Sequence, residues 1–376
     1  MNCRLWLHDE EWVELQRFSE FEFRNAWNKP GGFGCMAVMK EQGKVRHIRS
    51  GVKYTVTPKV YPPWHKNAGE DVTDGWADGI VYQAGQIISY GDVPEHKPAG
   101  WSVSCSWRMT GTDAIGLMQK HAFAGTFERK GTVDEVFAAI VEQVNAQADK
   151  PIIRLMETKN RVGGWAHIKS GRFDPVSLIN DLAWLGHERS GAPQGPSTVI
   201  VGLGPDLVPE VALAPSWASL KGVSGRSHHG VSDPTEKDTQ RTLKRGDVLM
   251  MPRQHMIPSH DRVVIKWAGG SYELGEAGKP TVFASRLHFA DEKTAAAFAA
   301  CVLTKSTSTY AAPMRSVGAY GNTFEAIPGQ MVSMEHPDGF YVERMSEIHY
   351  QQKTQMYAVG IGGIVPLAQE NNTGEQ

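Results

Sequence analysis

The sequence predicts an α+β protein, mainly antiparallel β, in which two barrel-type β domains flank a small α/β domain. At both ends of the chain, short runs of β-branched and aromatic residues are separated by glycine and proline, as in antiparallel sheets and barrels. Between these ends, apolar residues recur at the spacing of helices. We therefore expect β domains over residues 1–110 and 211–376, and the α/β domain over residues 111–210.

The first domain contains a distinctive turn. Strand-like runs surround a polar segment that starts at Asn28, continues through Pro30 and ends with the pair Gly31-Gly32. Because proline fixes φ and glycine tolerates a positive φ, we expect a tight connection between two long strands, with the positive φ at one of the two glycines. The rings of Trp27 and Phe33 are expected to flank this connection and to be at least half buried.

Three helices are predicted in the α/β domain. The strongest follows Thr132, because Thr132 and Glu135 form a capping box ahead of apolar residues at helical spacing. A shorter helix is expected over residues 112–122. The third begins after Asp174, an N-cap followed by proline at the first helical position, and ends near Gly186. Strands are expected over residues 152–156, 165–168 and 198–203.

The last domain combines β patterns with one polar insertion. Residues 221–260 are rich in glycine, serine, histidine and proline, so we expect a long loop there. A helix is expected from Asp291 to Thr304, and Asp338-Gly339 is a hairpin signal because Asp-Gly suits a type I′ turn. Strands are expected over residues 247–251, 262–267, 281–287, 330–335, 340–345 and 357–365.

Composition and charge argue against several classes of function. The 39 lysines and arginines against 41 acidic residues give a net charge of −2, so nothing indicates binding to nucleic acid or to a membrane surface. No apolar run approaches the ~18 residues that span a bilayer, and the first residues show no secretion signal. The four cysteines form no C-x-x-C pair, which argues against a cysteine zinc site and favours a reducing cytosol. They are Cys3, Cys35, Cys105 and Cys301.

Two segments with the residue types of ligand sites are better explained as loops. Gly202-Leu203-Gly204 follows an apolar run and resembles a dinucleotide loop, but a third glycine is missing and Pro205 has no N–H to offer a phosphate. An ordinary turn is therefore favoured. His228-His229 and the pair His255 and His260 lack the helical spacing of zinc ligands, so we expect them in a solvated loop.

No group of residues shows a catalytic spacing. Glu135 and Asp261, which precedes Arg262, are isolated carboxylates without a partner at a recognisable distance in the sequence. Cys105 lies between two serines in an alternating strand pattern, which favours a buried thiol over a nucleophile. We therefore predict no catalytic, cofactor-binding or metal-binding residues, no cofactor, and no enzymatic activity.

The passage from Trp12 to Val38 resembles the opening of the phage tail hub proteins, the baseplate-hub or tail-tip family of tailed phages and related injection machines. The resemblance lies in the turn, with one extra glycine at Gly32. The matching residues are Arg24, Trp27, Asn28, Pro30, Gly31 and Phe33. Further segments are similar to that family in the same order over nearly the whole chain. These are residues 79–81, 111–118, 174–186, 327–332 and 345–350.

The resemblance implies a homotrimer. Each subunit would supply two similar barrels, so that three subunits form a pseudo-hexameric ring that joins a six-fold tail tube to a three-fold spike or fibre. The implied partners are further copies of the chain, the tail tube or distal tail protein, the tape-measure protein and the central spike or fibre. DNA would pass through the ring without specific binding. The implied location is the virion tail tip or baseplate, after synthesis in the host cytoplasm, without membrane insertion.

Two other functions stay open on the sequence. Eleven tryptophans are spread along the chain, and dispersed aromatic residues usually anchor cores and interfaces. If several of them shared one face, they would suit a carbohydrate- or receptor-binding tail module. A cell-wall hydrolase with an unrecognised pair of carboxylates is the second alternative.

Overall fold

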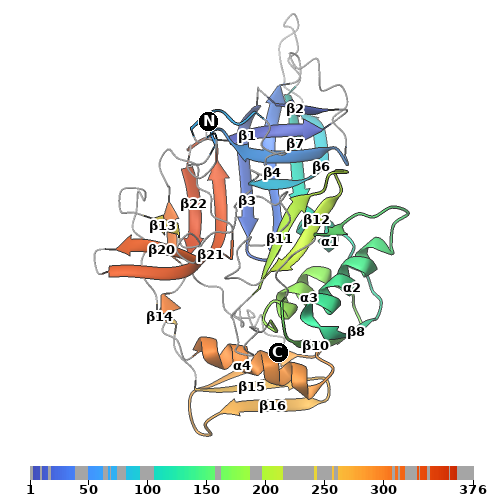
Figure 1. Cartoon of the computed structure of the whole chain (residues 1–376), viewed down its shortest axis with the longest axis vertical. Coiled ribbons are helices and arrows are strands. Elements are labelled where there is room, and N and C mark those ends of the chain that lie inside the picture. The colour runs from blue at the N-terminus through green and yellow to red at the C-terminus, as the bar shows by residue number, and fades with distance from the viewer. Residues whose placement is uncertain are drawn as a thin grey trace, which may run out of the picture.

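The computed structural model of the chain has an elongated arrangement (Figure 1), with a large sheet at one end, helices beside its lower part, and a small sheet covered by another helix at the other end. The structure describes residues 3–8, 11–15, 18–38, 50–61, 67, 69–73, 82–93, 106–156, 162–186, 197–214, 241–243, 256–257, 261–306, 310–311, 314–317, 328–329, 331–336, 339–354 and 356–361.

The large sheet contains twelve strands from both ends of the chain. Its order is β13-β20-β21-β3-β4-β7-β6-β5-β1-β2, and β22 pairs with both β21 and β19. The strands are β1 (Cys3–His8), β2 (Trp12–Glu14), β3 (Phe18–Ala26), β4 (Lys29–Val38), β5 (Lys53–Pro58), β6 (Gln83–Val93), β7 (Ser106–Asp113), β13 (Arg241–Leu243), β19 (Met314–Val317), β20 (Met331–His336), β21 (Gly339–Gln351) and β22 (Met356–Ile361). All pairings are antiparallel except that of β13 with β20.

The predicted antiparallel β content is confirmed, but the expected closed barrels are not. The pairings among the described strands form an open path, and β3 pairs with β21 so that the first and last thirds share one sheet. Residues 22–26 of β3 lie opposite residues 347–351 of β21. Phe21 and Phe23 alternate along β3, and Tyr350 of β21 lies opposite Phe23, so the pairing places these rings on one buried face. Phe23 stacks on Tyr350 with ring centroids 5.7 Å apart, whereas Arg24 is exposed.

The connection between β3 and β4 is as tight as predicted, but its positive φ is at another residue. The strands are joined through Trp27 and Asn28, and Trp27 is partly buried while Phe33 is buried. Asn28 has a φ of 47°. Gly31 and Gly32 lie within β4, so the prediction of positive φ at a glycine of this turn was wrong. Asparagine tolerates this conformation better than most residues, so the turn forms without glycine.

The middle of the chain has the three predicted helices. They are α1 (Ala114–Gln119), α2 (Val133–Asn145) and α3 (Pro175–Leu182). Both halves of the capping box at Thr132 and Glu135 are present, and the Asp174 carboxylate accepts a hydrogen bond from the Ser177 N–H. The strands are β8 (Phe127–Thr132), β9 (Arg154–Leu155), β10 (Trp165–Ser170), β11 (Thr198–Leu203) and β12 (Pro209–Ala214). The sequence analysis did not anticipate β12, which forms a hairpin with β11.

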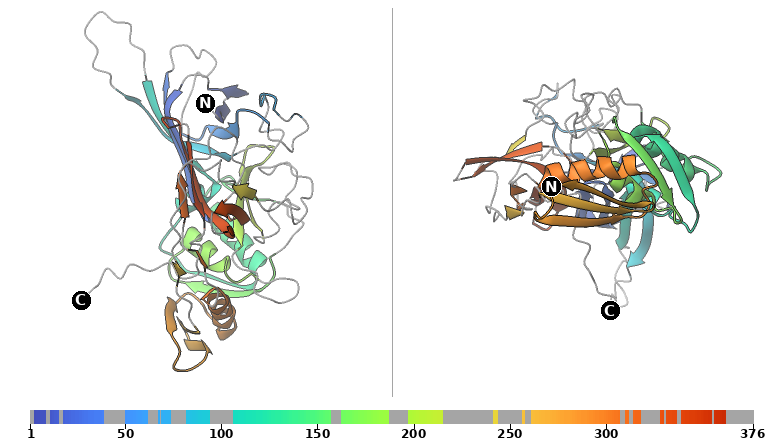
Figure 2. Two further views of the ribbon diagram at one scale, coloured as in Figure 1. Left: turned by 90° about the vertical axis from the view of Figure 1, so that its left-hand side faces the viewer. Right: turned by 90° about the horizontal axis from the view of Figure 1, so that it is seen from below.

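A small sheet and one helix form the far end of the molecule (Figure 2). The sheet has the order β16-β15-β17, and the parallel pairing of β15 with β17 places the hairpin strand β16 on the other side. Its elements are β15 (Arg262–Trp267), β16 (Gly270–Gly275), β17 (Thr281–Arg286) and α4 (Glu292–Ser306). A separate pair joins β14 (Met256–Ile257) to β18 (Tyr310–Ala311). The buried side chains of this sheet and α4 belong to the same core cluster as those of α1, α2 and α3.

Several predicted features lie outside the described residues. These are most of the polar segment 221–260, the strand over residues 247–251, the segment 79–81, and the residues Cys105, His228, His229, His255 and His260. The hairpin predicted at Asp338-Gly339 is supported by its flanking strands, because β20 and β21 pair with His336 opposite Gly339.

Candidate functional site

The turn that resembles the tail hub proteins joins the large sheet to the α/β part. The Asn28 side chain is buried and bridges two backbone groups at the start of β11. Its Nδ2 donates to the carbonyl oxygen of Ser197 at 3.0 Å, and its Oδ1 accepts from the Val199 N–H at 2.7 Å. Beside it, the Trp27 ring packs edge-on against Trp184, with centroids 5.7 Å apart. These contacts therefore fix the position of the turn, and of the large sheet that contains it, against β11 and Trp184.

Asp113 holds the same turn from the other side. Its carboxylate accepts from the Gly31 N–H and from the Gly116 N–H, each at 2.9 Å, so it caps α1 and binds β4 at once. The neighbouring Thr112 hydroxyl donates to the carbonyl oxygen of Gly31 at 3.0 Å. Complete burial raises the pKa of Asp113 to about 7, although the hydrogen bonds from the backbone N–H groups of Gly116 and Gly31 act in the opposite direction.

Glycine is required at positions 31 and 32, at the start of β4, because atoms of other strands approach these two residues closely. A Cβ on Gly31 would lie 2.6 Å from Asp113 Oδ2 and 2.8 Å from Asn25 Oδ1. A Cβ on Gly32 would lie 2.6 Å from the carbonyl oxygen of Gly111 in the neighbouring strand. The Gly-Gly pair therefore lets β4 come close to β7 and to the Asp113 carboxylate, which explains why glycine is needed here without a positive φ.

A chain of polar side chains continues from this turn into the sheet. Tyr54 donates its hydroxyl hydrogen to Gln83 Oε1 at 3.0 Å, and Gln83 Nε2 donates to Asn25 Oδ1 at 2.6 Å. Asn25 Nδ2 then donates to the carbonyl oxygen of Tyr82 at 2.8 Å. Burial, and to a lesser degree the nearby charge of Asp113, raises the pKa of Tyr54 well above its usual value. The tyrosine therefore stays a neutral hydrogen-bond donor.

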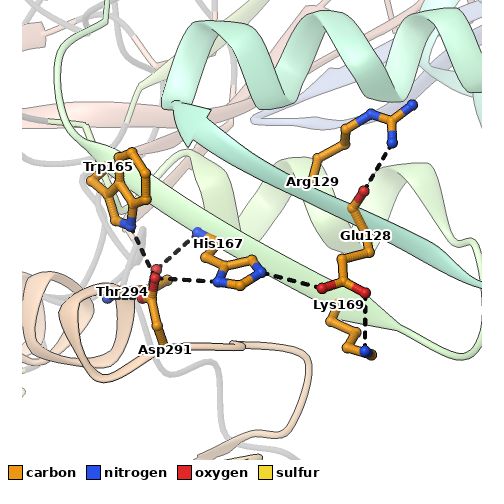
Figure 3. A network of polar contacts seen from close by, with 7 residues as sticks. All are labelled: Glu128, Arg129, Trp165, His167, Lys169, Asp291 and Thr294. Carbon is orange, nitrogen blue, oxygen red and sulfur yellow. Dashed lines mark hydrogen bonds and ion pairs between the residues drawn. The ribbon is translucent and has the colours of Figure 1, made fainter.

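A second junction joins β10 to the start of α4 (Figure 3). His167 Nδ1 lies 3.3 Å from Asp291 Oδ2, and His167 Nε2 lies 3.4 Å from Glu128 Oε1. Trp165 Nε1 donates to Asp291 at 3.0 Å, while the Thr294 hydroxyl accepts from the His167 N–H at 2.9 Å. Burial raises the pKa of Asp291, but hydrogen bonds from Thr294 and Trp165 outweigh burial and lower it overall. The Asp291 carboxylate therefore stays ionised at the junction between β10 and α4.

The backbone and one further carboxylate strengthen this junction. The Lys169 N–H donates to the carbonyl oxygen of His288 at 2.8 Å, and the Ala290 N–H donates to that of His167 at 2.9 Å. Asp181 of α3 is buried and lies 3.1 Å from Arg286 Nε and 2.5 Å from His288 Nε2. Because a buried carboxylate needs a cation such as the Arg286 guanidinium beside it, α3 and the end of β17 are held together.

The described residues that the sequence analysis considered as possible ligand-binding or catalytic residues lie in different parts of the structure. Gly202 lies within β11 and Gly204 in the turn of the β11–β12 hairpin, where no helix follows, so the ordinary-turn interpretation is confirmed. Glu135 completes the cap of α2, and Arg262 pairs with Glu273 across the small sheet. Within the described ranges, no three histidine, cysteine, aspartate or glutamate residues lie close enough to hold a metal ion.

The described cysteines and tryptophans belong to packed regions. Cys3, Cys35 and Cys301 are buried free thiols, and burial raises the pKa of Cys35 and of Cys301 to about 12. Trp184 is buried, and the other tryptophans with described side chains are partly buried. These are Trp6, Trp12, Trp27, Trp165 and Trp267. In the part of the chain that the structure describes, no helix is long and apolar enough to cross a membrane.

The fold is that of phage tail proteins. No protein-family model matches the sequence, and no curated protein matches it. The 43 kDa tail protein of prophage MuSo2 from Shewanella oneidensis superposes with a TM-score of 0.51 at 10% identity, over 97% of this chain and 99% of that one. A tail protein from Neisseria meningitidis MC58 gives 0.50 at 12% identity, over 96% of each chain. Prophage tail protein gp18 from Listeria monocytogenes EGD-e gives 0.50 at 9% identity, over 96% of this chain and 94% of that one.

The predicted resemblance to tail proteins is therefore confirmed for the fold. The sequence analysis found the turn that carries this resemblance, but it missed the carboxylate that holds it, Asp113. The available signal was its position at the end of a strand and directly before a helix, where aspartate is a common N-cap. In the described part of the site, the side chains of Asn28 and Asp113 bind backbone groups of other elements and so hold these elements together.

Proposed function

We propose that the chain is a structural component of a phage tail tip or baseplate and acts there as a trimeric hub. Three subunits would form a pseudo-hexameric ring that joins a six-fold tail tube to a three-fold spike or fibre. The observation that carries this proposal is the match in fold to the Shewanella prophage tail protein, which extends over 97% of this chain and 99% of that one. A match of both chains end to end argues for the same architecture, not for one shared module.

The internal architecture supports an adaptor. A hub must keep its sheet and its outer domains in fixed orientation while neighbouring proteins bind it. Asn28 and Asp113 supply this rigidity at one junction, and Asp291 and Asp181 supply it at the other. The hydrogen bonds and ion pairs of these side chains join different elements of the fold. We therefore propose no enzymatic activity and no cofactor.

The strand pairings are also consistent with a ring. The shared sheet ends in β13 on one side and in β2 on the other, and these edges would close against strands of a neighbouring subunit, because open sheet edges favour pairing with another chain. The proposed partners are further copies of the chain, the tail tube or distal tail protein, the tape-measure protein and the central spike or fibre. A net charge of −2 suits a channel through which DNA passes without binding, since a basic lumen would retain phosphate.

The oligomeric mass tests the proposal directly. Three chains of 41.4 kDa give a complex of about 124 kDa, which sedimentation or mass photometry distinguishes from a monomer. Negative-stain images of the same sample should show a three-fold ring with a central hole. A stable monomer that binds neither tail-tube nor tip components, and that binds glycans on an array, would contradict the hub and favour the carbohydrate-binding alternative. Lysis of bacterial cell walls in a zymogram would favour the hydrolase alternative.

A further inference from the structure

Two histidines connect the two sides of the junction between β10 and α4 in a reciprocal way. His167 belongs to the α/β part, and its Nδ1 lies 3.3 Å from Oδ2 of Asp291 at the start of α4. His288 lies between β17 and α4, and its Nε2 lies 2.5 Å from Oδ2 of Asp181 in α3. Each side of the junction therefore supplies one imidazole and one carboxylate, so that protonation of either histidine acts on the junction in the same direction.

Both ring nitrogens of His167 face carboxylates (Figure 3). Nε2 lies 3.4 Å from Glu128 of β8, while Nδ1 faces Asp291. A neutral imidazole has one N–H and can direct it at only one of these carboxylates, whereas an imidazolium directs an N–H at each. Asp291 is itself fixed in place, because its Oδ1 accepts from the Thr294 N–H at 2.8 Å at the start of α4. The arrangement around His167 therefore favours the protonated ring.

The neighbouring cations indicate which pair depends more on protonation. Glu128 and Asp181 each have a further cation, Lys169 at 2.9 Å and Arg286 at 3.1 Å. In the described part of the chain, Asp291 has an ion pair with His167 and with no lysine or arginine. We therefore expect the charge of His167 to act mainly on Asp291. Two other cations lie near this ring: Lys130, which is opposite His167 in the register of β8 with β10, and Lys293 of α4, which lies over the Trp165 ring.

The small sheet and α4 are attached to the rest of the chain at two places. β14 precedes the small sheet in sequence and pairs with β18, which follows α4. The second attachment is the junction itself, where Ile168 and Phe289 form an antiparallel bridge. If the junction opens, the small sheet and α4 stay connected through β14 and β18. The junction is therefore the attachment at which a change of charge alters how the small sheet is held.

We propose that the junction between β10 and α4 is a pH-sensitive joint, which holds the small sheet and α4 more firmly under mildly acidic than under mildly alkaline conditions. Imidazole is the side chain that ordinarily changes charge between about pH 5 and 8. At the acidic end of this range, each imidazolium attracts the carboxylate across the junction. As the pH rises this attraction is lost, and the joint opens more often. The apolar core that both sides share does not titrate, so the closed state stays the major one at every pH.

Hydrogen exchange measured by mass spectrometry on the purified full-length chain tests this inference. The Lys169 N–H donates to the His288 carbonyl oxygen and the Ala290 N–H to that of His167, so peptides with these two amides report opening of the joint. After correction for the intrinsic effect of pH on exchange, their protection should fall roughly 2- to 30-fold from pH 5.5 to pH 8, the combined effect of two ion pairs of ordinary strength. Peptides from α2 report global unfolding, and the ratio of the two protections isolates the joint.

Glutamine substitutions show whether the histidines cause this change. The double variant His167→Gln/His288→Gln keeps a hydrogen-bond donor at each position without a titratable charge, so its protection ratio should not change with pH. His349→Gln is a matched control, because it removes a histidine that lies 3.4 Å from a carboxylate, Glu22, on the large sheet; it should keep the wild-type pH dependence.

A protection ratio in the wild type that does not change with pH would overturn the inference, and so would a pH dependence that survives in the double variant. If the double variant loses the protection of α2 and is therefore unfolded, His167→Gln alone decides. Since Asp291 pairs with His167, this single variant should lose most of the pH dependence, and full retention would overturn the inference.

Discussion

Substitution of Asp113 tests whether a buried carboxylate holds the large sheet to α1. Asp113→Asn keeps the size of the side chain but removes its ability to ionise and gives it one acceptor atom in place of two. Since Gly31 and Gly116 both donate to the carboxylate, one of these N–H groups would then face an amide NH₂. A buried donor left without an acceptor costs about 1–3 kcal/mol, so the variant should be less stable.

The pH dependence gives a sharper expectation. Burial raises the pKa of Asp113 from 3.8 to about 7 in the folded chain. Between these values the folded chain keeps a proton that the unfolded chain releases, so raising the pH favours unfolding. At roughly 1.36 kcal/mol for each pH unit, the stabilising contribution lost between pH 4 and pH 7 amounts to about 4 kcal/mol. The stabilisation that comes from the raised pKa of Asp113 is fully present below pH 4 and is lost above pH 7.

The assay compares urea unfolding of the wild type and of Asp113→Asn at fixed protein concentration across pH 4 to 8. All other groups titrate alike in both proteins, so the difference in their free energies of unfolding isolates Asp113. We expect the wild type to lose about 4 kcal/mol relative to the variant as the pH rises from 4 to 7. This exceeds the roughly 1–3 kcal/mol by which the wild type is more stable at low pH, so the order of the two stabilities should reverse before the difference becomes constant. A difference that is flat or grows over this range would refute the reasoning, because it would mean that the backbone N–H donors keep the carboxylate ionised despite its burial.

Two further substitutions test the junctions. Asn28→Ala should cost about 3 kcal/mol, because it leaves the Ser197 carbonyl and the Val199 N–H unpaired; Asn28→Gly should be about 1 kcal/mol less damaging, since glycine tolerates the φ of 47°. Equal melting curves for the two variants would show that the backbone conformation there costs nothing. Asp181→Ala should cost about 3 kcal/mol and raise hydrogen exchange in β17 and α3, because Arg286 and His288 lose their buried anion, whereas Asp149→Ala on the exposed surface should change neither. Unchanged exchange at β17 in Asp181→Ala would contradict a role in this junction.

Local signals predicted the helices because they depend on neighbours in sequence. Thr132 and Glu135 are three residues apart and cap α2 by themselves, and Asp174 with Pro175 begins α3 for the same reason. The alternation of Phe21 and Phe23 likewise predicts a strand with one buried face. Such patterns do not identify which strand pairs with which. The pairing of β3 with β21 in one sheet could therefore not be predicted from them.

The junction residues were hidden for a related reason. Asp113 is an unremarkable carboxylate until β4 brings the Gly31 N–H to it from 82 residues away in sequence. In the turn itself, the glycine pair suggested positive φ, whereas Asn28 adopts it and the glycines provide space for close contact. A glycine can be required by conformation or by space, and only the packing of other strands decides between these two reasons.

The pairing of β3 with β21 also sets an order of events during synthesis. Arg24 and Glu347 form an ion pair across this pairing although they are 323 residues apart. At roughly 5–20 residues per second, a ribosome needs about 15–65 s to make the intervening chain. During that time β3 has β4 on one side and an open edge on the other, and its aromatic face lacks Tyr350 and Tyr357. The nascent chain must therefore either delay collapse of its first strands or be shielded by a chaperone until its last strands emerge.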